Sequence, residues 1–197
     1  MGKLGKEFYL NKSVTEVAVG LLGKRLCTNI NGQLSIGKIV ETEAYSGRND
    51  KACHANNGRR TKRNEVMYAE GGLAYVYFCY GIHSMFNVVT NIIDQADAVL
   101  IRAVEPMVGI DIMMARRGVS KPNKVSSGPG NVCKALGIQL NHNQISLLDD
   151  EIWIEDGNLI APEEVIAKPR VGVDYAGEDA LLLWRYYIKE NLWISKK

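Results

Sequence analysis

The sequence predicts an α+β fold, a single domain with a curved, mainly antiparallel sheet and surrounding helices. The chain has 197 residues, of which 46% are hydrophobic and 23% are charged, a composition typical of a globular domain that buries its own core. Predicted strands and helices are interspersed along the chain, and the predicted hairpins are short. Together these observations favour a mixed fold with antiparallel pairing.

The first predicted helix begins near Ser13, because the S-x-x-E spacing to Glu16 forms a capping box. Apolar residues follow at helical spacing, and Gly23 is suited to end the helix. After the turn-forming pair Asn31-Gly32, a strand is predicted from Gln33 to about Glu43.

The segment 46–64 is polar and rich in Gly and Asn, so it is predicted to be a long loop. Long loops in compact domains are usually functional or disordered. The next segment, 71–93, has no charged side chain, yet a lipid-facing helix would have to bury its polar residues, among them His83 and Asn87. Its aromatic and β-branched residues predict instead a hairpin with strands at 73–80 and 85–93.

The remaining chain continues the mixture of strands and helices. The predicted elements are a strand at 98–104, a helix at 109–117 ended by Gly118, a loop at 119–127, a short helix at 129–136, a strand at 151–154 and a last helix at 176–187. Trp184 and Tyr187 are predicted to share one face of that last helix.

The net charge of +2 hides an uneven distribution. Residues 47–64 contain six Lys and Arg against one Asp, and residues 112–148 contain five Lys and Arg with no acid. Residues 149–180 contain ten acids against two bases. Each basic segment alone could be solvated surface, but two of them favour a face for a polyanion, with the acidic segment lying away from it.

The sequence indicates neither a metal site, such as a zinc knuckle, nor a redox motif. Its four cysteines have no C-x-x-C spacing, and its three histidines match neither H-x-x-x-H nor H-E-x-x-H. The first ten residues contain no apolar run of a signal peptide, so we expect a cytoplasmic protein with reduced thiols.

Two carboxylates mark a candidate site at the end of the strand 33–43. In the motif E-T-E-A-Y, strand alternation places Glu41, Glu43 and Tyr45 on one face. One carboxylate could activate a water molecule, with a pKa set by burial. The alternative is that both are solvated charges at a sheet edge.

The hairpin motif A-Y-V-Y-F-C-Y-G carries aromatic rings that either pack in the core or stack on flat ligands such as bases. Tyr80, beside Gly81, could act as a wedge in a duplex. Arg102 lies in an otherwise apolar strand and needs an anion, either an internal carboxylate such as Glu105 or a phosphate. The motif S-S-G-P-G-N offers backbone amides to an anion, which is a weak signal on its own.

Several motifs in order resemble the alkyladenine (3-methylpurine) DNA glycosylase family. They are L-L-G-K-R-L, E-T-E-A-Y, His54, R-R-T-K-R-N, A-Y-V-Y-F-C-Y-G, Asn87, L-I-R-A-V-E-P, S-G-P-G-N-V-C-K-A-L-G-I and the closing R-V-G-V-D-Y-A-G-E-D-A. The resemblance covers nearly the whole chain, so it implies one DNA glycosylase domain over residues 1–197.

The resemblance implies hydrolysis of the bond between a damaged purine and its deoxyribose, with the base flipped out of the stack and an abasic site left behind. The family's general base corresponds to Glu43. The rings that hold the flipped purine correspond to Tyr45 and Tyr77, with His54 beside them, and these faces would attract cationic alkylpurines. The wedge corresponds to Tyr80.

Asn87 corresponds to the position that rejects guanine through its 2-amino group, and Arg102 to a position near the phosphate and the water. Glu41 matches the family pattern without a catalytic role, so we expect it to be structural. The resemblance implies no metal, no cofactor, no Schiff-base lysine and no cleavage of the DNA backbone. The expected partner is double-stranded DNA with alkylated or deaminated purines (3-methyladenine, hypoxanthine or ethenoadenine). We expect a monomer without membrane contact, associated with the nucleoid, or with the nucleus in a eukaryote.

Two other functions use some of the same features. A non-catalytic binder of damaged or single-stranded nucleic acid explains the basic segments and the aromatic residues, but it leaves the carboxylate beside them unexplained. A hydrolase of free nucleosides explains the carboxylate, but it gives no role to the wedge and the two basic segments.

Overall fold

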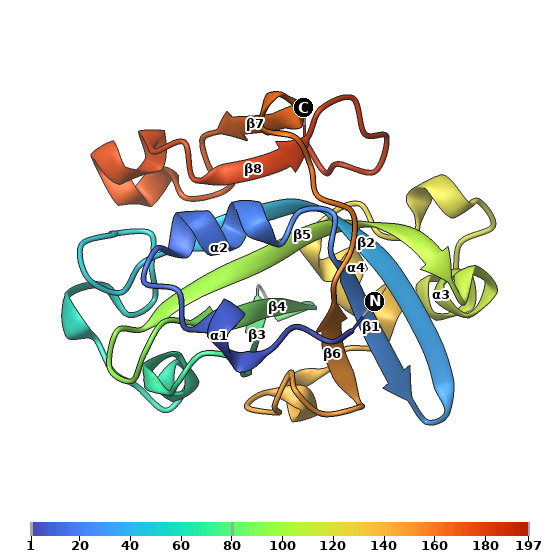
Figure 1. The fold of residues 1–197 in the computed structure, drawn as a ribbon, viewed down its shortest axis with the longest axis horizontal. Helices are drawn as coiled ribbons and strands as arrows, with labels where there is room; N and C mark the ends of the chain where they lie inside the picture. Colours follow the sequence, from blue (N-terminus) through green and yellow to red (C-terminus); the bar gives the residue numbers. More distant parts are fainter. Residues whose placement is uncertain (1, 80, 197) are drawn as a thin grey trace.

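The computed structural model describes residues 2–79 and 81–196, which form an α+β fold around one open sheet of eight strands (Figure 1). The strand order is β3-β4-β5-β2-β1-β6, with β8 paired to both β2 and β7. Every pair is antiparallel, so the predicted fold class is confirmed. The strands are β1 (Arg25–Ile30), β2 (Gln33–Tyr45), β3 (Ala74–Cys79), β4 (His83–Thr90), β5 (Asp97–Val108), β6 (Ile152–Glu155), β7 (Val165–Lys168) and β8 (Arg185–Ile188).

In the described residues, four α-helices flank the sheet, and 3-10 turns lie in the loops. The α-helices are α1 (Lys6–Tyr9), α2 (Val14–Gly20), α3 (Ile110–Arg117) and α4 (Pro129–Leu136). The 3-10 segments are η1 (Asn56–Gly58), η2 (Glu65–Tyr68), η3 (Pro122–Lys124), η4 (Leu140–His142), η5 (Pro162–Glu164) and η6 (Asp174–Leu181).

Local signals account for the helices that the sequence predicts. The Ser13 hydroxyl accepts a hydrogen bond from the backbone amide of Glu16 and so caps α2. Gly118 and Gly137 adopt left-handed conformations and end α3 and α4. The helix after Ser13 ends at Gly20, earlier than Gly23. These helices are otherwise confirmed at their predicted places.

The long strand β2 organises the sheet. Its first half pairs with β1 through a turn in which Asn31 and Gly32 have positive φ, as a tight hairpin requires. Its far end pairs with both β5 and β8. The register against β5 shifts on both sides of Glu41, and such irregularities bend a strand and redirect its side chains. The bend lies at the predicted pair of carboxylates.

The core lies between the sheet and its helices. Helix α2 packs on β2 and β5, and α4 packs on β4 and β5. One cluster of buried side chains joins these elements, including Val17, Leu21, Ile101, Phe86 and Leu136. Figure 1 shows the β7–β8 hairpin at one end of the sheet with the C-terminus beside it. This hairpin packs a smaller apolar cluster against β2 and β5.

The predicted last helix at 176–187 is wrong. The chain forms the 3-10 segment η6 and then the strand β8. Gly177 has φ 61° and ψ −127°, which interrupts any helix. The run W-R-Y-Y-I that follows is aromatic and ends on a β-branched residue, so it suits a strand with partners on both edges. Trp184 and Tyr187 therefore share no helix face. Strands β1 and β7 had no prediction.

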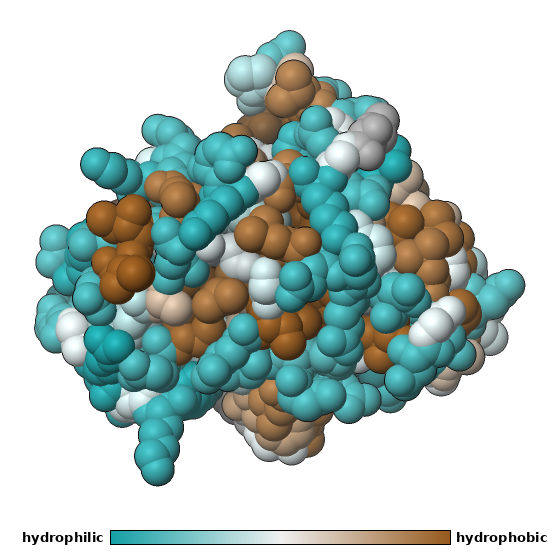
Figure 2. Space-filling view, turned by 60° about the horizontal axis from the view of Figure 1, so that its bottom comes forward, coloured by the Kyte–Doolittle hydropathy of each residue, from teal (hydrophilic) through white to brown (hydrophobic). Residues whose placement is uncertain are grey.

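The segment 71–93 forms the predicted hairpin, as β3 and β4. Across the part of the chain that the structure describes, no helix has the length and hydropathy to span a membrane. Figure 2 turns the lower side of Figure 1 forward, and on this face apolar side chains lie in separate patches divided by polar ones. Scattered patches of this kind are normal on a protein surface.

The acidic segment 149–180 does not lie away from the first basic loop, so that prediction is wrong for its last part. Asp179 accepts a hydrogen bond from the Lys51 backbone amide at 2.8 Å, and Arg170 forms two hydrogen bonds with Asp50. Because the end of the acidic segment is fixed on the loop 46–64, the loop is a packed part of the molecule.

Candidate active site

A cavity of about 500 Å³ lies between the sheet and the loops that cover it. Strands β3, β4 and β5 supply one wall, and the loop 46–64 and the segment 171–175 supply the others. The predicted residues Tyr45, His54, Tyr77, Asn87 and Arg102 all line it. Five side chains that are far apart in the sequence thus meet around one space. The prediction for Tyr80 lies outside the described residues.

Glu43 is fully buried directly behind the cavity wall. Its Oε2 accepts hydrogen bonds from the Tyr45 hydroxyl at 2.7 Å and from Nη1 of Arg102 at 3.2 Å. Its Oε1 accepts one from the Val171 backbone amide at 2.8 Å. All three donors line the cavity. The carboxylate is therefore fixed in place, one side chain away from the open space.

Glu41 is also fully buried, but other groups bind it. Its oxygens accept hydrogen bonds from Nη1 of Arg185 at 2.9 Å and from the Ser195 backbone amide at 2.6 Å. The interpretation of two solvated edge charges is therefore wrong for both carboxylates. Glu41 joins β2 to β8 and to the C-terminal segment, in agreement with a structural role.

Arg102 lies between the two carboxylates. Its Nη1 donates to Glu43, and its Nε lies 3.4 Å from an Oε1 of Glu41. Both carboxylates thus reach one guanidinium, as expected from their predicted common face. The suggested partner Glu105 is wrong, because Glu105 pairs with Lys38 and accepts a hydrogen bond from Asn191. Nearby negative charge raises the pKa of Arg102, although burial lowers it, so Arg102 is a cation.

An aromatic cluster forms the opposite wall. The rings of Tyr75 and Tyr77 lie 5.2 Å apart with a tilt of 36°, and His54 meets Tyr77 edge-on at 4.8 Å. The Nδ1 of His54 lies 2.9 Å from the Tyr75 hydroxyl. Burial raises the pKa of Tyr77 above its usual value. This wall therefore presents uncharged rings to the cavity.

His54 is held neutral by its surroundings. Burial, together with the charges of Arg63 and Arg59, lowers its pKa to about 4. A neutral imidazole beside stacked phenols suits a site for an aromatic ligand better than an imidazolium does.

We expect this burial to make stability depend on pH. Unfolded His54 takes up a proton near pH 6.5 but folded His54 only near pH 4, so the free energy of unfolding falls as the pH falls through this range. The contribution is about 1–3 kcal/mol. Urea unfolding of the wild type and of His54→Gln, at neutral and acidic pH, checks it. The wild type should lose more stability on acidification than the variant, and equal losses would show that His54 does not carry the effect.

Asn87 is buried, and its position is fixed by the backbone. Its side-chain amide donates to the Tyr75 carbonyl at 3.1 Å. The amide oxygen is thus turned from that carbonyl, and the side chain lines the cavity beside the aromatic cluster.

Arg170 has no predicted role in the sequence, although it opens the closing motif R-V-G-V-D-Y-A. It is buried and binds both oxygens of Asp50, at 2.5 and 2.7 Å. Its guanidinium lies 4.8 Å from the ring centroid of Tyr45 and 5.2 Å from that of Trp184. One face of Tyr45 is thereby supported, and the neighbouring Val171 amide is brought to Glu43. An Arg within an acidic segment is the only signal that could have indicated it.

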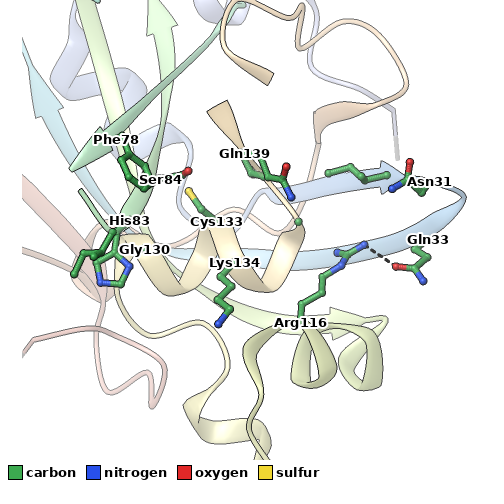
Figure 3. A pocket seen from close by; sticks show the side chains of 14 residues that line it. Asn31, Gln33, Phe78, His83, Ser84, Arg116, Gly130, Cys133, Lys134 and Gln139 are labelled. Carbon is green, nitrogen blue, oxygen red and sulfur yellow. Dashed lines mark hydrogen bonds between the residues drawn. The ribbon is translucent and has the colours of Figure 1, made fainter. Parts of the chain in front are cut away.

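A second cavity, of about 400 Å³, adjoins the same hairpin and the helix α4 (Figure 3). Phe78 lines both cavities. Lys134 and Arg116 line the second one, and Arg116 donates to Gln33 at 3.1 Å. Its described lining contains no carboxylate that could act as an acid or a base. Among the described residues, a buried carboxylate is therefore found only behind the first of these two cavities.

Within residues 2–79 and 81–196, no three His, Cys, Asp or Glu side chains come together in a way that could hold a metal ion. The chemistry available in the first cavity comes from a carboxylate, a guanidinium, an imidazole and phenols. A buried carboxylate beside aromatic walls is the arrangement expected of an enzyme that hydrolyses a glycosidic bond to an aromatic base.

Comparisons with known proteins agree with this class. A family model described as methylpurine-DNA glycosylase matches residues 7–192. Three curated relatives carry the name "Putative 3-methyladenine DNA glycosylase". The protein from Chlamydia felis is 46% identical, over 98% of this chain and 99% of its own. Those from Clostridium perfringens and Carboxydothermus hydrogenoformans are 44% and 47% identical, over 99% and 98% of this chain and 100% and 99% of their own.

The chain belongs to the methylpurine-DNA glycosylase family. Membership makes it a DNA glycosylase, a hydrolase of base excision repair that binds DNA and acts on methylated purines of the 3-methyladenine class.

Proposed function

We propose that this enzyme flips alkylated or deaminated purines out of double-stranded DNA into the first cavity and hydrolyses their N-glycosidic bond, leaving an abasic site. The observation that carries the proposal is the buried Glu43 carboxylate behind a cavity with aromatic walls. The proposed substrates are 3-methyladenine, hypoxanthine and ethenoadenine. Each is a flat purine, and a cavity of about 500 Å³ is large enough for one.

The aromatic residues have a binding role in this proposal. The flipped purine stacks between Tyr45 and Tyr77, with His54 at its edge, and Tyr80 fills the space that the base leaves. Asn87 excludes guanine, because its fixed amide leaves no room for a 2-amino group. Four of these side chains line the cavity, namely Tyr45, His54, Tyr77 and Asn87. Asn87 is also fixed by its hydrogen bond to the Tyr75 carbonyl.

Glu43 is proposed to act as the general base. It takes a proton from water, the water oxygen bonds to the anomeric carbon, and the purine leaves with the electron pair of the broken bond. Its negative charge also stabilises the cationic sugar of the transition state. Arg102, which donates to Glu43 at 3.2 Å, is placed near the water and the phosphate.

The whole chain is proposed to be one catalytic domain that works as a cytoplasmic monomer. Strands from both halves of the sequence share the sheet, and both halves contribute to the cavity. A second site within the chain is not needed for a single displacement at one base.

An excision assay tests the proposed function. Duplexes with a single hypoxanthine, ethenoadenine or 3-methyladenine are incubated with the enzyme and treated with alkali, and strand scission reports the abasic site. Scission of all three supports the proposal. Tight binding without scission would favour the non-catalytic binder, and faster release of base from free nucleosides than from duplexes would favour the nucleoside hydrolase.

The salt dependence of DNA binding should be modest. Two of the six cations of residues 47–64 are engaged within the protein, since Arg48 pairs with Asp97 and Arg60 with Glu65 and Asp94. We therefore expect log Kd to change with log salt with a slope of about 3–5, since few phosphates are contacted. Fluorescence anisotropy of a labelled duplex at increasing NaCl measures it. A Kd that does not vary with salt would show that these cations do not face the DNA.

A further inference from the structure

We propose that Arg63 sets the preference of this enzyme between neutral and positively charged purines. The inference rests on the proposed function, because it assumes that the purine stacks on Tyr77. The guanidinium carbon of Arg63 lies 4.8 Å from the centroid of the Tyr77 ring. Arg63 is exposed and lines the same cavity. A solvent-exposed cation thus lies against the ring on which a flipped base is expected to stack.

The two proposed stacking rings differ in the cation that they carry. Arg170 lies over Tyr45, but two hydrogen bonds to Asp50 fix it and balance its charge. No carboxylate within the described chain forms an ion pair with Arg63. The positive charge of Arg170 over Tyr45 is therefore balanced by Asp50, whereas the positive charge of Arg63 over Tyr77 has no such partner among the described residues.

The rings of the cavity wall near Arg63 are uncharged at neutral pH. His54 is neutral near pH 7, and its pKa is lowered to about 4 partly by Arg63 itself. Burial raises the pKa of Tyr75 to about 12, and Arg63 opposes that rise. Both effects show that the field of Arg63 reaches the rings on the cavity wall. Arg63 is thus a cation in direct contact with a ring of this wall, while Arg59 also acts on His54.

A positively charged purine and a neutral one meet this wall differently. The face of Tyr77 attracts a cation, but Arg63 already uses that attraction. A cationic base stacked on the same ring is repelled by the positive charge of the guanidinium. A neutral purine feels no such repulsion, and a guanidinium plane also stacks well on it. Arg63 therefore favours neutral lesions, and its removal should favour cationic ones.

The test compares two lesions in three variants. Under single turnover, 3-methyladenine, which is cationic while attached to deoxyribose, is released from dimethyl sulfate-treated duplex DNA, and hypoxanthine, which is neutral, from an inosine duplex. In Arg63→Gln, the ratio of the first rate to the second should rise roughly tenfold over the wild type, given a repulsion between charges on one ring. Arg63→Lys keeps the charge and should keep the ratio near that of the wild type.

Lys62→Gln is the matched control, because it removes one positive charge from the same loop at a side chain that lies over no aromatic ring of the described chain. Its ratio should equal that of the wild type. If both rates fall equally in Arg63→Gln, Arg63 only contacts the DNA backbone and the inference is overturned. If the wild type releases neither base, the proposed function fails instead. Arg63 is exposed, so the variants should fold, which circular dichroism checks.

Discussion

Glu43→Gln is expected to release damaged purines about 10²–10⁴-fold more slowly than the wild type, the range that a positioned general base contributes. The amide has nearly the shape of the carboxylate but cannot take a proton from water. It also lacks the negative charge that stabilises a cationic sugar. The variant should still bind a lesion duplex, because the rings of Tyr45 and Tyr77 and the basic loop are unchanged.

The hydrogen bonds of Glu43 predict a second effect of this change. Both of its oxygens accept hydrogen bonds, which come from the Tyr45 hydroxyl, Arg102 and the Val171 backbone amide. The glutamine amide replaces one acceptor with a donor, which leaves one of these groups unsatisfied and costs about 1–3 kcal/mol of stability. Rates must therefore be measured well below the unfolding temperature of the variant.

Single-turnover release of hypoxanthine and anisotropy with the same duplex measure chemistry and binding separately. Glu41→Gln is the matched control, since it alters an equally buried carboxylate on the same strand whose donors are Arg185 and the Ser195 amide. It should lose comparable stability but far less activity. Near-normal release by Glu43→Gln would show that Glu43 is not the base.

The sequence alone places these two carboxylates together but cannot say what binds them. Strand alternation puts Glu41 and Glu43 on one face, and the structure confirms that one guanidinium reaches both. Tyr45 is a local donor to Glu43, but three other donors come from more than 100 residues further along the chain, at Val171, Arg185 and Ser195. No local pattern encodes such distant partners, so burial of both carboxylates could not be predicted.

Local and distant causes also explain which helices and strands were predicted and which were missed. The helices α2, α3 and α4 were predictable because their end signals are local: Ser13 caps α2, and Gly118 and Gly137 end α3 and α4. Strand β8 was missed because its partners are the distant strand β2 and the strand β7, which had no prediction. Tertiary pairing overrode the local prediction of a helix.

Asp50→Asn is expected to lower the free energy of unfolding by about 3–5 kcal/mol, because it leaves a buried guanidinium without its counter-charge. Arg170 and Asp50 have side-chain exposures of 0% and 1%. The remaining partners of Arg170, the Ala44 and Asp179 carbonyls, satisfy hydrogen bonds but do not neutralise the charge. Urea unfolding measures the loss. Disrupting the exposed Lys6–Glu70 pair with Lys6→Met is the control and should cost less than about 1 kcal/mol.

Asp50→Asn should also lower the rate of purine release. This effect distinguishes a role in positioning the active site from a role in stability alone. Arg170 immediately precedes Val171, whose amide holds Glu43, and it supports the ring of Tyr45. Loosening Arg170 therefore displaces one donor of the base and one stacking surface together. Under conditions in which Asp50→Asn is fully folded, its rate of purine release should still fall, by roughly tenfold or more, as small misplacement of a reacting group is costly. An unchanged rate in the folded variant would mean that the Asp50–Arg170 pair stabilises the loop without positioning Glu43.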